Sequence, residues 1–128
     1  NETRHLKWMN KSITIMRVDT VLKYYGYVTA ESRFSDLFQD KHKPQILVPS
    51  KQLKSFTLVM GYFIDNGWIR STGGKATFKF IEDRIQIVGR NSPVSRNYMK
   101  QTNESFKKIG VGEKKHTGRL SNFIEELH

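Results

Sequence analysis

Lysine and arginine are the residues whose number and spacing most clearly indicate a chemistry for this chain. Its 128 residues carry 22 Lys and Arg against 12 Asp and Glu, which gives a formal net charge of +10 and a pI near 9.9. From Arg84 to Arg119 there are nine basic residues and two acidic ones, a local excess of +7 (nine minus two). Folding does not require such an excess, but it attracts polyanions in a salt-dependent way. We therefore expect an acidic partner, with nucleic acid as the leading candidate.

The residues that catalysis or metal binding would need are not grouped along the chain. It has no cysteine, and its four histidines are far apart, with no pair at a metal-ligand spacing of three or four residues. It contains no nucleophile elbow and no glycine-rich nucleotide motif. Distant residues can still meet in three dimensions. On the sequence motifs we expect a non-enzymatic module with no cofactor and no metal.

Hydropathy and cysteine usage bear on the compartment. No run of eighteen apolar residues and no charged-then-apolar leader is present, so we expect no membrane partner. The absence of cysteine argues against a disulfide-built secreted scaffold. We expect an intracellular protein, with nucleus and cytoplasm not distinguished.

Apolar periodicity predicts the elements that position the basic residues in the first half of the chain. A helix is expected over 18–25, ended by Gly26, and a second short helix is expected to begin at Thr29. A strand is expected at 46–48. The strongest helix should begin at Pro49 or Ser50 and end before Gly67, because Leu53, Phe56, Met60, Phe63 and Ile64 repeat at helical spacing.

The second half of the chain changes period. Residues 76–80 and 85–88 alternate apolar and polar side chains, which predicts a hairpin turning at Glu82-Asp83, and 68–70 predicts a further strand before Gly73-Gly74. Two more helices are expected, one from Pro93 or Ser95 to Gly110 and one at the end of the chain. These elements predict one α+β domain over 1–128, divided into a basic arm (1–11), a core (12–90) and a helical extension (91–128). Leu6 and Trp8 could dock the arm onto the body.

The residues Phe56, Met60, Phe63, Gly67 and Ile69 are spaced as in the third helix and first wing strand of a winged helix-turn-helix domain. The chain resembles this family over about residues 17–80. One departure is the stretch 39–49, where the family has a tight turn. The resemblance implies a winged-helix fold, with three helices and a β-hairpin wing, to which the C-terminal helices are added.

The resemblance also implies how DNA would be contacted. The third helix would enter a major groove, and the wing would contact the backbone or an adjacent minor groove. Basic residues of the last third would add phosphate contacts. This predicts a non-enzymatic module that binds double-stranded DNA and acts in transcription, replication control or chromatin. The predicted contacts are Ser50, Lys51, Gln52, Lys54 and Ser55 on the helix, Arg70, Thr72, Lys75 and Lys79 on the wing, and Arg90, Arg96 and Lys100 beyond it.

Two alternatives stay open. The segment Gly61 to Gly67 is similar to the LAGLIDADG motif of homing endonucleases and maturases, with Asn66 where the family has its metal-binding acid, which implies a nucleic-acid-binding protein or an inactive endonuclease. The other alternative is a protein-interaction module that forms homodimers through the C-terminal helices. Its partner surface would comprise Tyr98, Phe106, Leu120, Phe123 and Ile124.

Overall fold

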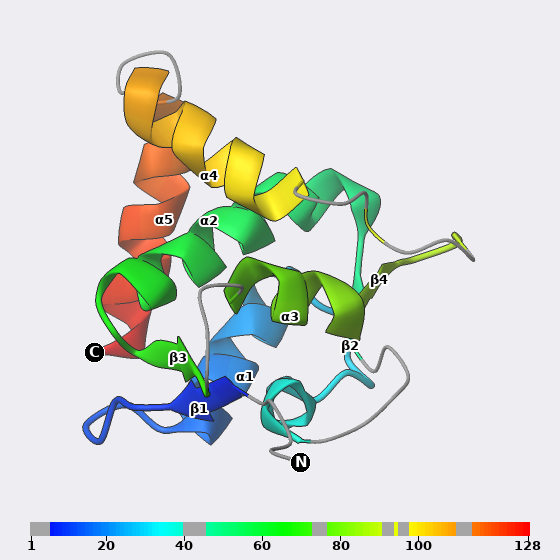
Figure 1. Ribbon diagram of the computed structural model, residues 1–128, viewed down its shortest axis with the longest axis vertical. Helices are drawn as coiled ribbons and strands as arrows, with labels where there is room; N and C mark the ends of the chain where they lie inside the picture. The colour runs from blue at the N-terminus through cyan, green and yellow to red at the C-terminus, as the bar shows by residue number, and fades with distance from the viewer. Residues whose placement is uncertain (1–5, 40–45, 73–76, 91–93, 95–97, 110–113) are drawn as a thin grey trace.

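The computed structural model describes residues 6–39, 46–72, 77–90, 94, 98–109 and 114–128, without the side chains of 106–109 and 114–117. The predicted α+β class is confirmed (Figure 1). The described helices are α1 (Ile15–Tyr24), α2 (Leu53–Asp65), α3 (Thr77–Arg84), α4 (Tyr98–Ile109) and α5 (Lys114–Leu127), with 3-10 turns η1 (Phe34–Phe38) and η2 (Ser50–Gln52). The strands are β1 (Leu6–Trp8), β2 (Ile46–Val48), β3 (Ile69–Ser71) and β4 (Ile85–Ile87).

Helix α2 is the central element of the fold. Nine of its 13 residues are buried, and Phe56, Met60 and Phe63 are fully inaccessible. Helices α4 and α5 pack directly against it, and α5 also packs against α1 (Figure 1). The predicted core stripe is confirmed, but burial extends well beyond one face. A helix that is apolar nearly all round is buried by its neighbours rather than displayed on the surface.

The strands form two small sheets that join distant parts of the chain. β1 pairs antiparallel with β3, and β2 pairs parallel with β4. The start of the chain therefore docks onto the body from residue 6 onward. Leu6 is 1% exposed, and the Trp8 ring contacts Phe34, Phe63 and Trp68 at 5.4–6.1 Å between centroids.

The hairpin predicted over 76–80 and 85–88 is wrong, because Thr77–Arg84 forms helix α3. Phe78, Ile81 and Ile85 also fit a helical spacing, but Glu82 lies on the same face and disguises it. Glu82 is only 5% exposed. Its Oε2 accepts a hydrogen bond of 2.9 Å from the backbone N–H of Met99, which offsets the cost of burying the carboxylate. A residue assigned to a turn is instead the acceptor for the first turn of α4.

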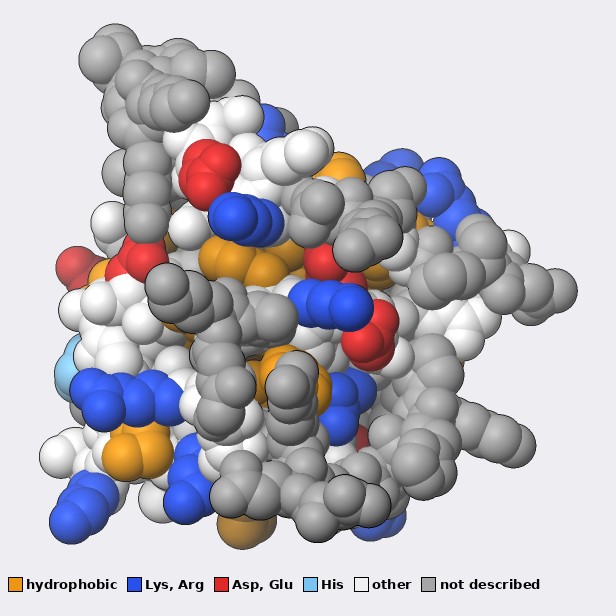
Figure 2. All heavy atoms as spheres, in the orientation of Figure 1, with side chains coloured by type: hydrophobic (Ala, Val, Ile, Leu, Met, Phe, Trp, Pro, Cys, Tyr) orange, Lys and Arg blue, Asp and Glu red, His pale blue; other side chains and the backbone are white. Residues whose placement is uncertain are grey.

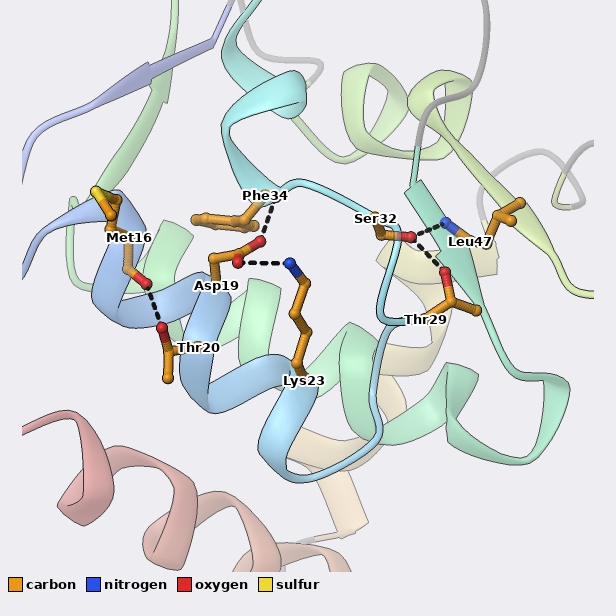
Figure 3. A network of polar contacts seen from close by, with 8 residues as sticks. All are labelled: Met16, Asp19, Thr20, Lys23, Thr29, Ser32, Phe34 and Leu47. Atoms are coloured by element: carbon orange, nitrogen blue, oxygen red, sulfur yellow. Dashed lines mark hydrogen bonds and ion pairs between the residues drawn. The ribbon is translucent and has the colours of Figure 1, made fainter.

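The second helix predicted from Thr29 is also wrong in extent, since only the 3-10 turn η1 forms. In this stretch, side chains form hydrogen bonds with backbone N–H groups and with one another (Figure 3). The Thr29 and Ser32 hydroxyls are 2.7 Å apart, and Ser32 Oγ accepts from the N–H of Leu47. Asp19 of α1 accepts from the N–H of Phe34 and pairs with Lys23. Such side-chain partners compete with helix formation.

The C-terminal helices complete the core and are not an extension appended to it. Met99 of α4 and Phe123 of α5 are both 0% exposed, and Leu127 is 4% exposed. The proposed partner surface is therefore wrong for Phe123, and Leu120 and Ile124 are also packed against the core. Tyr98 is partly buried in the same way, whereas the Phe106 side chain lies outside the described residues.

Candidate nucleic-acid interface

Two adjoining hollows lie at the amino end of α2. The larger has a volume of about 420 Å³ and is lined by Gly26, Pro49, Ser50, Lys51, Gln52 and Val88. The smaller, of about 220 Å³, is lined by Tyr25, Tyr27, Gln52, Arg119 and Asn122. Gln52 belongs to both, so we treat them as one feature and name it the α2 groove.

Local geometry explains how distant segments meet at the α2 groove. Gly26 has a φ of 72°, a left-handed conformation that lets the chain reverse after α1 and place Tyr27 on the groove. The ladder between β2 and β4 continues with a 3.0 Å hydrogen bond from Val88 N–H to the Val48 carbonyl, which brings Val88 beside Pro49 and Ser50. α5 supplies Arg119 and Asn122 from the opposite side.

The groove holds three of the predicted contacts and excludes a fourth. Ser50 and Lys51 are exposed, and Gln52 is partly exposed. Ser55 is only 4% exposed, so the prediction that it contacts nucleic acid is wrong. Its Oγ lies near the Tyr27 side chain without a hydrogen bond of normal geometry, and Gln52 Oε1 is likewise buried without a hydrogen-bond partner among the described residues. Lys54, the second residue of α2, is half-buried.

The electrostatics of the groove change along α5. Burial raises the pKa of Tyr27, and the Arg119 guanidinium opposes that rise. Burial also raises the pKa of Tyr25, and the carboxylates of Glu126 and Glu125 raise it further. The groove is therefore most positive where Arg119 and Lys51 lie, and less positive toward the last turn of α5.

The other predicted contacts do not form one surface with the groove. Arg70, in the middle of β3, is exposed, and Thr72, just beyond the end of β3, is partly exposed; β3 follows the opposite end of α2. The 13 residues of α2 separate these positions from Lys51 by about 20 Å, at 1.5 Å per residue. Arg90 is exposed two residues after the groove residue Val88. Lys75 and Arg96 lie outside the described residues.

Lys79 and Lys100 are exposed, but each has an acidic residue one helical turn away. Lys79 precedes Asp83 by four residues on α3, and Lys100 precedes Glu104 by four residues on α4. Side chains at this spacing are neighbours on a helix surface. These two lysines therefore add little net positive potential, in contrast to Lys51, Arg90 and Arg119, none of which has a carboxylate within four positions along the chain.

Sequence reasoning missed Tyr25, Tyr27, Arg119 and Asn122 as parts of one site. In the sequence, Arg119 belongs to the basic stretch from Arg84 to Arg119, and Tyr25 is the last residue of the helix predicted over 18–25. Only the packing of α5 beside α1 brings them together. The only sequence feature that points to this site is the positive charge of Arg119, and that charge does not indicate which residues lie beside it.

Three features of the part of the chain that the structure describes bear on the other functional classes. Within it, no group of three or more His, Asp or Glu side chains is placed to hold a metal ion. In the LAGLIDADG-like segment Asp65 and Asn66 are exposed, and the Asn66 amide donates to the Tyr62 carbonyl. None of the described helices is both long and apolar enough to cross a membrane.

Comparison of the chain with models of known protein families, with curated proteins and with solved structures finds no significant match. The residues of the α2 groove are therefore the basis on which a function is inferred.

Proposed function

We propose that this chain is a non-enzymatic nucleic-acid-binding module that holds the phosphate backbone in the α2 groove. One observation supports this most directly: Lys51 and Arg119 come from distant segments and line the two hollows that meet at Gln52, at the start of α2. The 3-10 turn η2 leads directly into α2, and the N–H groups of Gln52 and Leu53 donate to the carbonyls of Pro49 and Ser50. The end of this helical segment that favours anions is therefore the start of η2, because the first N–H groups of a helix lack helical acceptors and carry the positive end of its dipole. Arg90, exposed beside the groove, adds to the same potential.

The burial of α2 favours contact with phosphates over readout in a major groove. A helix that reads base edges exposes a full face along its amino-terminal half. Between Leu53 and Met60 of α2, only Lys54 is not buried. The winged-helix assignment and the roles in transcription, replication or chromatin remain predictions. Duplex DNA is the first partner to test, since its charge density is higher than that of single strands.

The test is a fluorescence anisotropy titration of a labelled duplex at several salt concentrations. Lys51→Ala and Arg119→Ala should each weaken binding about tenfold at 0.1 M salt, since contacts to charged groups contribute about 1.5–3 kcal/mol. Each should also lower the slope of log K against log salt by about one.

Lys79→Ala and Lys100→Ala are matched controls, because they remove the same charge from exposed helix positions with an acidic neighbour. Their affinities should stay within about twofold of wild type. Equal losses in all four variants would mean that net charge alone drives binding. Wild-type affinity in the two groove variants would exclude the α2 groove as the interface.

A further inference from the structure

The ribbon formed by β1 and β3 displays two cations side by side. In its register Lys7 lies directly opposite Arg70, between the pairs Leu6–Ser71 and Trp8–Ile69. Leu6 and Ile69 are each 1% exposed, whereas Lys7 and Arg70 are both exposed. Because side chains alternate along a strand, both cations lie on the solvent face of the ribbon.

Placing Lys7 directly opposite Arg70 is expected to lower the stability of the ribbon, and no contact of Lys7 with the described residues compensates for this loss. Like charges directly opposite on an antiparallel pair are destabilising. Neither side chain has an ion-pair partner among the described carboxylates. The Arg70 guanidinium lies close to Gly67, its Nη2 being 3.5 Å from where a Cβ of that glycine would be, next to the carboxyl end of α2, which favours cations. Lys7 has no comparable contact among the described residues.

The surroundings of the pair are also positive. Lys11 is exposed in the loop that follows β1. Figure 2 shows blue side chains at the lower left of the molecule, over β1, β3 and this loop, with no red side chain among them. Over α3 and α4, in the middle of the same view, blue and red side chains lie next to each other.

We propose that Lys7, Lys11 and Arg70, together named the ribbon surface, form a second phosphate-binding surface that contacts the same nucleic acid as the α2 groove. This inference rests on the proposed function. The two surfaces flank opposite ends of one helix, about 20 Å apart. Duplex DNA carries a phosphate every 3.4 Å on each strand, so this distance corresponds to about six base pairs. A long polyanion is the kind of partner that can meet both.

The deciding variant is Lys7→Glu in the full chain. It turns the like-charged cross-strand pair into an oppositely charged one, so the melting temperature should rise by about 1–3 °C. Its affinity for the duplex should nevertheless fall by about tenfold or more, and the salt slope should also fall. A gain in stability together with a loss of binding distinguishes a binding surface from a structural one. Lys7→Ala is the second variant and should show a smaller loss.

Lys79→Glu is the matched control, since it changes the net charge from +10 to +8 in the same way. It should weaken binding by less than about threefold. Comparable loss in this control would overturn the ribbon surface in favour of net charge. Combining Lys7→Glu with Lys51→Ala should add the two losses in log K, because sites this far apart are independent.

Failure of this inference is distinguishable from failure of the proposed function. Wild-type affinity in Lys7→Glu and Lys7→Ala, with weakened binding in Lys51→Ala, would overturn the ribbon surface and leave the α2 groove standing. Wild-type affinity in all three would overturn both. Loss of binding to vesicles containing phosphatidylserine, with unchanged binding to the duplex, would assign the ribbon surface to an anionic membrane and overturn the inference.

Discussion

Tyr27 is the residue that joins the α2 groove to the core. It is 5% exposed, and its ring stacks on Phe123 with centroids 5.7 Å apart and an interplanar angle of 20°. Its other neighbour is Tyr25, stacked at 5.7 Å. Burial raises the pKa of its hydroxyl because an ionised phenolate would lose solvation, and Arg119 opposes this only in part.

The raised pKa of Tyr27 predicts a loss of stability at high pH. The ordinary pKa is 10.0, so the folded state binds more protons than the unfolded state above that value. The stability contribution is fully present below pH 10 and is lost as the pH rises through the folded pKa. Tyr27→Phe should therefore lose less stability than wild type between pH 9 and 11, measured by thermal melts. Tyr24→Phe, at a position 76% exposed, is the control and should follow wild type.

At the scale of elements, Gly61 allows α2 and α4 to approach closely. A Cβ at Gly61 would lie 2.2 Å from Oδ1 of Asn103, which is on α4 and 6% exposed. Asn103 therefore has little room to move away. Gly61 is the first residue of the LAGLIDADG-like segment, and in this fold it is the point at which α4 packs against α2.

Two helical glycines make a matched pair for testing this contact. Gly61→Ala should lower the free energy of unfolding by about 1–2 kcal/mol, since overpacking outweighs the gain in helix propensity of about 1 kcal/mol. Gly118→Ala on α5 should raise it by about 0.5–1 kcal/mol, because a Cβ there meets nothing within 4 Å. Denaturant melts measure both. A stabilised Gly61→Ala would show that α4 does not pack as closely as described.

For the whole molecule, the first and last elements that the structure describes belong to one core. β1 pairs with β3 after α2, and α5 packs against both α1 and α2. The Arg17 guanidinium donates a hydrogen bond of 2.6 Å to the backbone carbonyl of Glu126. The Tyr25 hydroxyl donates one of 3.2 Å to the backbone carbonyl of Asn122. These contacts predict cooperative folding and argue against an independent C-terminal dimerisation segment.

Shortening the chain tests this prediction. A chain ending at Gly112 lacks the buried Phe123 and Leu127, so it should show no cooperative thermal transition by circular dichroism. Phe123→Ala in the full chain should cost about 3–5 kcal/mol of stability. Leu120→Ala, at a half-buried position on the same helix, should cost less. A folded monomer from the shortened chain would restore the view of α5 as a separate interaction segment.

The sequence by itself determined the features that depend on local spacing and composition. The positive charge is a property of composition, and the apolar faces of α1 and α2 follow from helical periodicity. Gly26 and Gly67 were predicted as helix stops, and both have positive φ values, of 72° and 73°. The strand at 46–48 also follows from its apolar run. In each case the residues concerned are neighbours along the chain.

Only the tertiary structure decided which distant residues share a surface. The contact with α4 identifies Glu82 as a buried acceptor. Without that contact, the sequence pattern around Glu82 predicts a hairpin and not a helix. The pairing of Lys7 with Arg70, and the placement of Lys51 and Arg119 on adjoining hollows, likewise join segments more than sixty residues apart. Periodicity reports whether a side chain is buried but not what buries it, because the partner is selected by packing among segments far apart in sequence.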